Sequence, residues 1–318
     1  MSRHPFALAR ARRLMGAGTV GAGIFALVLA GAYAQEAPAR PVIDRAPARV
    51  AFGKTVVIGG SLEDGSAGDL VALQRRTPSG SWTAIRTAAV DRDLKVRFRI
   101  KGVKRSARYR LQHNTSGGAS ATASTATSAI SNGVRVRVAP KLTVRVRPAR
   151  VMAGSGVRVR GRLRPTSAGR RVTIARRAGG GWRPIARPRV KTGRYATRFS
   201  VSKPSRSRIK VVFRGDAINT RAARARKLVV YDPDVASWYG PGLYGNGTAC
   251  GQTLGYDTVG VAHRTLPCGT KVGILYRGRS ITVPVIDRGP YGSAEWDLTR
   301  GAAARLKFSG HDTVGTVH

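Results

Sequence analysis

Asp287 is the residue of this 318-residue chain best placed to act as an acid or a base. It follows the run Ser280–Ile286, which together with Lys271–Tyr276 predicts a hairpin of two strands. A Gly-Pro turn comes directly after it, and loops of this kind hold functional side chains on a rigid frame. A carboxyl group there can give a proton to a reacting oxygen and later take one back. The alternative is a turn carboxylate that caps its own loop beside Arg288.

Motifs of several other enzyme classes are missing from the sequence. There is no G-x-S-x-G elbow of a serine hydrolase and no H-E-x-x-H zinc motif. Gly53-Lys54-Thr55 looks like the end of a phosphate-binding loop, but that motif requires a glycine at the position of Ala48. We therefore expect no metal and no cofactor.

Four blocks in the C-terminal quarter carry a family resemblance. They read S-W-Y-G-P-G from Ser237, A-H-x-T-L-P-x-G-T from Ala262, D-R-G-P-Y from Asp287 and D-L-T from Asp297. In this order they resemble the RlpA-like double-psi β-barrel family of cell-wall proteins, which are relatives of expansins. The resemblance covers about residues 235–318. It implies a six-stranded barrel with an open groove, and peptidoglycan glycan as its ligand.

The resemblance also implies a reaction, because active members of the family are lytic transglycosylases. Asp287 would protonate the glycosidic oxygen between N-acetylmuramic acid and N-acetylglucosamine. The same carboxylate would then take the proton of the sugar's C6 hydroxyl, which closes a 1,6-anhydro ring. Ordinary glycoside hydrolases use two carboxylates and a water instead. An acid at this position must stay protonated near neutral pH, which burial or a neighbouring carboxylate favours.

Further groove residues follow from the same resemblance. His263 matches the family's groove histidine, which would bind the sugar or orient the acid. Its alternative is a structural histidine that holds the strand end at Ala262–Pro267. Asp297 is either a second groove carboxylate or a charge at the start of a short helix that Thr299 caps and that ends near Ser309-Gly310.

Three aromatic residues are candidates for stacking on sugar rings: Trp238, Tyr239 and Tyr291. The alternative is that they belong to the barrel core, and this applies to Trp238 above all. Gln252 departs from the family, because active members carry a glutamate at this place, eleven residues before the histidine. Glutamine keeps the hydrogen bonds but cannot titrate. The alternative function is therefore a non-catalytic, expansin-like protein that binds or loosens the wall.

The N-terminus reads as an export signal. Basic residues precede an uncharged run from Leu14 to Gly31, and Ala32-Tyr33-Ala34 has the form of a signal-peptidase site. Residues 1–34 are thus predicted to be a signal peptide, with a retained membrane anchor as the alternative. Export favours a disulfide between Cys250 and Cys268 over a free thiol pair or a zinc site with His263.

The middle of the chain contains an internal sequence repeat with two copies. Residues 48–111 and 149–211 match at an offset of about 101, with Gly60 and Leu62 facing Gly161 and Leu163. Apolar and polar residues alternate within each copy, which predicts strands with one buried face. We expect an all-β protein: immunoglobulin-like sandwiches at 40–138 and 139–231, then the barrel at 235–318. The Ser/Thr/Ala/Gly-rich segment 114–133 is predicted to be a long loop of the first sandwich.

The charge of the chain is concentrated before the barrel. The formal net charge is +42, and residues 1–231 hold 49 basic and 8 acidic residues, whereas residues 232–318 hold 8 and 7. Such a field favours anionic wall polymers or lipid headgroups as partners of the repeats. Nucleic acid is disfavoured, because export would separate the protein from the chromosome. The alternative is an arginine-rich coding bias with no function.

Overall fold

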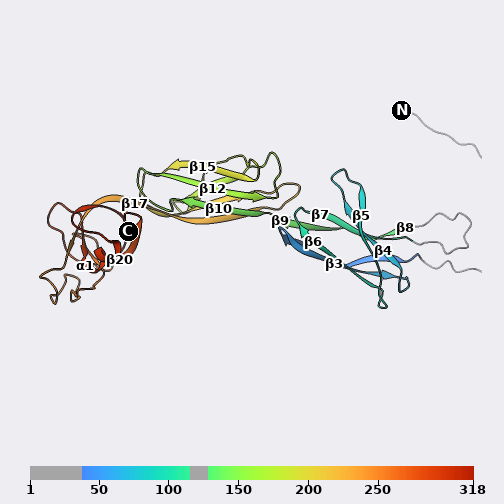
Figure 1. Ribbon diagram of the computed structural model, residues 1–318, viewed down its shortest axis with the longest axis horizontal. Coiled ribbons are helices and arrows are strands. Elements are labelled where there is room, and N and C mark those ends of the chain that lie inside the picture. Colours follow the sequence, from blue (N-terminus) through green and yellow to red (C-terminus); the bar gives the residue numbers. More distant parts are fainter. Residues whose placement is uncertain (1–37, 115–127) are drawn as a thin grey trace, which may run out of the picture. The chain divides into compact units, whose positions relative to one another are not determined.

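The computed structural model describes residues 38–114 and 128–318 and is built almost wholly of strands, which confirms the all-β prediction (Figure 1). The predicted signal peptide, residues 1–34, and most of the predicted loop at 114–133 lie outside the described residues. Within the described ranges, no helix is long and apolar enough to span a membrane.

The first repeat consists of two sheets with a shared apolar core. Fully buried Val56, Ile58, Leu73 and Leu111 lie in this core, since alternate residues of each strand point inward. One sheet has the order β1 (Arg40–Arg45), β3 (Lys54–Glu63), β6 (Lys95–Val103). The other has the order β2 (Arg49–Ala51), β9 (Val134–Ala139), β7 (Ala107–Asn114), β4 (Leu70–Arg76), β5 (Trp82–Ala89), with β8 (Ser128–Ile130) paired to β7.

The second repeat has the same plan. One sheet has the order β10 (Lys141–Arg147), β12 (Gly156–Arg164), β15 (Arg194–Ser200). The other has the order β14 (Gly181–Ala186), β13 (Thr173–Ala178), β16 (Ser205–Phe213), β17 (Ala222–Tyr239), with β11 (Arg150–Met152) parallel to β17. The sandwich plan follows from these sheets and their cores, while the immunoglobulin-like assignment and the domain boundaries stay predictions.

A matched pair of glycines has the same steric cause in both repeats. A Cβ atom on Gly60 would lie 2.4 Å from the carbonyl oxygen of Val42, and one on Gly161 would lie 1.9 Å from that of Thr143. At Gly161 the missing side chain also makes room for the Tyr195 hydroxyl, which donates to the Thr143 carbonyl oxygen at 2.6 Å. The neighbouring strand therefore approaches closely only because these positions carry no side chain.

The C-terminal strands pair around a ring. The order runs β17, β21 (Trp296–Thr299), β18 (Val261–Ala262), β20 (Arg279–Asp287), β19 (Lys271–Tyr276) and β22 (Asp312–Val317), and β22 pairs with β17 again. Two of the pairings, β17 with β21 and β18 with β20, are parallel. The predicted hairpin is confirmed, because β19 and β20 are antiparallel neighbours in register from Lys271↔Pro284 to Tyr276↔Arg279.

One short helix, α1 (Arg300–Leu306), packs against this ring. Thr299 caps it as predicted, since its hydroxyl accepts a hydrogen bond from the Ala302 amide at 3.3 Å. The helix ends at Leu306, earlier than the predicted end near Ser309-Gly310, because Lys307 adopts the left-handed conformation (φ 56°). Phe308 then turns back into the core, where it is 6% exposed.

Candidate active site

Asp287 is the last residue of β20, and its carboxylate is held by backbone donors. Its Oδ1 accepts from the Ala249 amide at 2.8 Å and from the Arg288 amide at 2.9 Å. Its carbonyl oxygen accepts from the His263 amide at 3.2 Å, which anchors the strand end. These two backbone amides fix the orientation of the carboxylate through Oδ1, and the Tyr239 hydroxyl is a further donor beside the group.

Asp297 is a second carboxylate beside the first. It lies on β21 directly opposite Ser237 of β17, whose hydroxyl donates to Asp297 Oδ1 at 2.8 Å. Burial raises the pKa of Asp297, the Ser237 hydrogen bond lowers it, and the charge of nearby Asp287 raises it again. Asp297 therefore lies close enough to Asp287 to be affected by its charge.

Tyr239 lies next to both carboxylates. It is two residues after Ser237 on the same strand, so its side chain points to the same face. Burial and the neighbouring Asp287 charge raise the pKa of its hydroxyl, which keeps the proton in place. A hydrogen bond toward Asp287 also raises this pKa, although the buried hydroxyl makes no short, well-aligned hydrogen bond within the described residues. The hydroxyl can therefore donate to Asp287 or to a ligand.

The His263 side chain is buried and fully engaged. Its Nδ1 accepts from the amides of Thr265 at 3.1 Å and Leu266 at 3.0 Å, and its Nε2 lies 3.2 Å from Glu295 Oε1. These contacts require the neutral tautomer with the proton on Nε2. The ring also packs on Trp296 at 4.4 Å between centroids. This is the structural alternative, in which the histidine holds the turn beside Asp287; sugar binding by its ring stays a prediction.

Burial lowers the pKa of His263, although the carboxylate of Glu295 acts in the opposite direction. Protonation of Nδ1 would break both of its hydrogen bonds to the turn, and therefore the neutral form belongs to the folded state.

A disulfide ties down the loop that contacts Asp287. Cys250 and Cys268 are bonded as predicted, with their Cα atoms 5.7 Å apart, so neither thiol is available to a zinc ion. Cys250 directly follows Ala249, whose amide holds Asp287 Oδ1. Gln252 ends the same loop. Its backbone carbonyl oxygen accepts from the Thr248 amide at 2.7 Å, and its backbone amide donates to the Thr248 hydroxyl. The Gln252 residue is exposed.

The three aromatic candidates have different surroundings. Tyr291, four residues after Asp287, is 85% exposed and can present its ring to a ligand. Trp238 is 37% exposed and lies outside the core cluster, which contradicts the core alternative. Side chains alternate along β17, so Trp238 and Tyr239 point to opposite faces of the strand. Trp238 is thus not brought together with the two carboxylates, whereas Tyr239 is.

Sequence reasoning missed three residues that position the site. Ser237 binds Asp297, and Glu295 faces His263. Arg264 donates to the carbonyl oxygens of Pro290, Gly292 and Ala294 at 2.7–2.9 Å and so shapes the loop after Asp287. Ser237 and Arg264 lie inside the recognised blocks, which was the one available signal; their contacts depend on residues far away in the sequence.

A scan against family models matches residues 235–318 to the lytic transglycolase domain with the double-psi β-barrel fold. The C-terminal domain belongs to this family. The RlpA-like domain thus contains every candidate site residue described above and the ring of strands from Val235 onward.

Curated relatives match a part of the chain. An RlpA endolytic peptidoglycan transglycosylase of Campylobacter jejuni is 37% identical over 125 residues, 38% of this chain and 46% of that protein. Its counterpart in Pseudomonas aeruginosa is 41% identical over 92 residues, 27% of this chain and 25% of that protein. A Synechocystis protein named "Probable endolytic peptidoglycan transglycosylase RlpA" is 47% identical over 75 residues, 23% of each chain. The chain therefore spans less than half the length of these relatives.

Solved structures add nothing to this family assignment. A tetra-tandem repeat from the extending region of a large adhesion protein covers 81% of this chain, with 13% identity and a TM-score of 0.32. These values are too low to define a common fold.

Proposed function

We propose that this protein is an exported lytic transglycosylase that cleaves the bond between N-acetylmuramic acid and N-acetylglucosamine in peptidoglycan. One observation carries the proposal: two backbone amides hold Asp287 of the RlpA-like domain through Oδ1, beside a second, half-buried carboxylate. That arrangement fits a reaction that needs one acid able to give and retake a proton.

The reaction balances with Asp287 as its only proton carrier. Its Oδ2 gives a proton to the glycosidic oxygen, the C1–O bond breaks, and the N-acetylglucosamine end leaves as an alcohol. The C6 oxygen of the same muramic acid residue attacks C1, and its proton passes to Asp287. No water is consumed, and the acid is restored for the next bond.

Asp297 and Tyr239 support that carboxylate. Since burial and the charge of Asp287 raise the pKa of Asp297, Asp297 retains its proton at a higher pH than an isolated exposed carboxyl group would, which reduces the negative charge beside Asp287. The protonated Tyr239 hydroxyl supplies a hydrogen bond to a glycan oxygen or to the charged form of Asp287. Tyr291 stacks on a sugar ring, and His263 is a positioning residue that holds the turn.

The test is mass spectrometry of whole and peptide-stripped peptidoglycan after incubation with the mature protein. Products that end in 1,6-anhydro-N-acetylmuramic acid, made by the native protein and not by Asp287→Asn, are expected. Products ending in a free reducing sugar would instead mean hydrolysis by water and would refute the mechanism. A Tyr291→Ala variant should weaken binding more than it slows the cleavage step.

Gln252 favours a second candidate function, a wall-binding or wall-loosening protein without cleavage. The glutamine cannot titrate, and it ends the loop that donates to Asp287. If the native protein pellets with peptidoglycan but releases no anhydro product, Gln252→Glu is the variant to assay next. Activity gained by that substitution would mean that the groove is intact and lacks one carboxylate.

We further propose that the protein acts in the cell envelope and that its basic repeats attract it to anionic wall polymers or lipid headgroups. The supporting observation is the charge distribution, with 49 basic against 8 acidic residues before residue 232. Pelleting with isolated walls should therefore weaken steeply between low and moderate salt. Binding that is independent of salt would contradict the electrostatic attraction.

A further inference from the structure

The outer face of the sheet β10-β12-β15 carries a regular array of basic side chains. We call it the basic face. Every member is exposed, and every member points outward because alternate residues of each strand lie on one side. The members are Lys141, Arg145 and Arg147 on β10; Arg158, Arg160, Arg162 and Arg164 on β12; and Arg194 and Arg198 on β15.

Like charges oppose each other directly across these strands. The ladder pairs include Lys141↔Arg164, Arg145↔Arg160 and Arg162↔Arg194. Like charges at paired positions destabilise a sheet. Residues 139–231 contain 27 basic residues and a single acidic one, Asp216, which is bonded to Arg170 at 2.8 Å. No member of the basic face forms an ion pair with any described residue.

The first repeat shows that this fold does not require such a face. In the equivalent sheet β1-β3-β6, Arg40 pairs with Glu63 at 3.1 Å and Lys95 with Asp44 at 3.5 Å. The offset of 101 places Lys141 and Arg164 of the second repeat at the positions of Arg40 and Glu63 of the first. The first repeat therefore has an ion pair where the second has two positive charges that repel each other.

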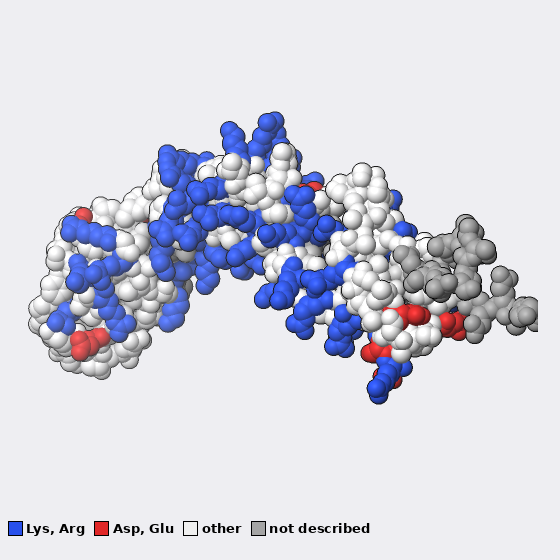
Figure 2. Space-filling view, turned by 45° about the vertical axis from the view of Figure 1, so that its right-hand side comes forward, with Lys and Arg blue, Asp and Glu red and all other residues white. Residues whose placement is uncertain are grey.

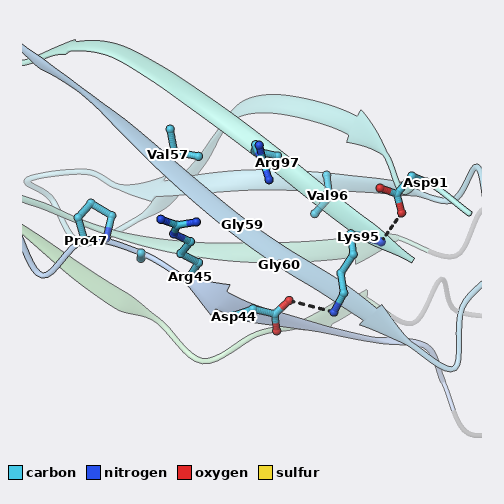
Figure 3. A pocket seen from close by; sticks show the side chains of 11 residues that line it. Asp44, Arg45, Pro47, Val57, Gly59, Gly60, Asp91, Lys95, Val96 and Arg97 are labelled. Carbon is cyan, nitrogen blue, oxygen red and sulfur yellow. Dashed lines mark hydrogen bonds and ion pairs between the residues drawn. The ribbon is translucent and has the colours of Figure 1, made fainter. Parts of the chain in front are cut away.

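Other positions differ in the same direction. Arg145 and Arg160 stand at the positions of Asp44 and Gly59. A hollow of about 750 Å³ lies over the first repeat and is lined by Gly59 among others. Figure 3 shows that Gly59 lies between the strands that carry Arg45 and Arg97. A general arginine bias would have charged both copies alike, but acidic residues remain on the first repeat (Figure 2).

We propose that the basic face binds a linear phosphodiester polymer of the cell wall. This deepens, and rests on, the proposed attraction of the repeats to anionic wall components. Eight of the nine side chains are arginines, whose planar guanidinium binds phosphate through two hydrogen bonds. Successive outward residues of a strand are about 7 Å apart, and Arg158–Arg164 thus spans about 20 Å. Bound phosphates would neutralise the repulsion between the ladder partners.

A linear polymer fits the face better than a membrane does. The non-basic outward positions of the three strands are Thr143, Gly156, Ala196 and Ser200, so no large apolar side chain is present to enter a bilayer. The rows of charge follow the strands, and an extended chain can follow such a row.

The test compares two triple variants of the mature full-length protein that remove the same charge. Arg158→Ser/Arg160→Ser/Arg162→Ser alters the basic face, and Arg97→Ser/Arg99→Ser/Lys101→Ser alters exposed β6 of the first repeat. Fluorescently labelled poly(glycerol phosphate) is titrated with each protein between 50 and 200 mM salt. The first triple should lose at least about tenfold in affinity at low salt. The slope of log K against log salt should shrink by about 2, since three phosphate contacts are lost. The second triple should retain both values.

A third variant separates charge from geometry. Arg158→Lys/Arg160→Lys/Arg162→Lys keeps the salt slope but should bind more weakly, because an ammonium group cannot bind phosphate through a planar fork. Circular dichroism of each variant controls for folding. Equal losses in the two serine triples would overturn the proposal while leaving general electrostatic attraction intact. Binding through this face only to single-stranded DNA, or only to vesicles of anionic phospholipid, would also overturn it. None of these outcomes bears on cleavage by Asp287, which the anhydro product reports.

Discussion

Removal of the disulfide should destabilise the RlpA-like domain by a calculable amount. The bond joins Cys250 to Cys268 across a sequence separation of 18 residues. In the chain-entropy model, breaking a bond that closes a loop of this length lowers the free energy of the unfolded chain, and so the stability of the domain, by about 3 kcal/mol at 25 °C. For a domain of this size, that loss corresponds to a fall in melting temperature of roughly 15 °C. The double variant Cys250→Ala/Cys268→Ala is the perturbation.

The assay is differential scanning calorimetry of the native protein and the double variant, each with and without reductant. Reductant should lower the melting temperature of the native protein to that of the variant and leave the variant unchanged. Far-ultraviolet circular dichroism of the same samples provides a second probe of unfolding. Because Ala249 neighbours Cys250, amide exchange at Ala249 should also accelerate as its bond to Asp287 loosens.

Two results would refute this reasoning. If the native protein and the double variant melt within about 2 °C of each other, the closed loop does not restrain the unfolded chain as the entropy model requires. If the variant loses stability yet reductant has no effect on the native protein, the loss comes from the substitutions themselves. A Cys250→Ser/Cys268→Ser variant distinguishes changed packing from the missing bond.

Three more predictions follow from contacts described above. Burial raises the pKa of Asp297 above its value in the unfolded chain, so native stability falls as pH rises from the unfolded pKa to the folded pKa of this group. Asp297→Asn should therefore stabilise the domain at pH 7 and not at pH 3, as urea unfolding measures. Gly161→Ala should cost about 3 kcal/mol, because its Cβ would overlap the Thr143 carbonyl oxygen, while Gly156→Ala, with nothing within 4 Å, should cost little by the same assay. The pKa of His263 is held below its unfolded value of about 6.5, so stability is lost as pH falls through 6.5; melting curves between pH 5 and 8 should show this loss reduced in His263→Gln.

The features that could be predicted from the sequence have local or repeated signals. Alternating residues indicated strands, and the offset of 101 revealed the repeats. Two strand-like runs around Arg277-Gly278-Arg279 predicted the β19–β20 hairpin, in which Arg279 turns out to be the first residue of β20. The disulfide followed from the predicted compartment and the presence of only two cysteines.

The features that could not be predicted depend on distant pairings. Asp297 could be read as a groove carboxylate or a helix charge until the parallel pairing of β17 with β21 put Ser237, 60 residues away, against it. The exposure of Trp238 likewise depends on which face of β17 turns inward. The contacts that engage both nitrogens of His263 include Glu295, which nothing in the local sequence connects to it.

The ring of strands has a consequence for the order in which the chain folds. The first half of β17 pairs with β16, which precedes it, but its second half waits for residues far downstream. Asp234 meets Trp296 and Thr316, which are 62 and 82 residues later in the sequence. During synthesis, the second half of β17 is therefore an open strand edge, the kind that favours pairing with other chains. Long-range pairing of this sort is slow. We expect the nascent protein to need protection from aggregation until β22 has emerged and closed the ring.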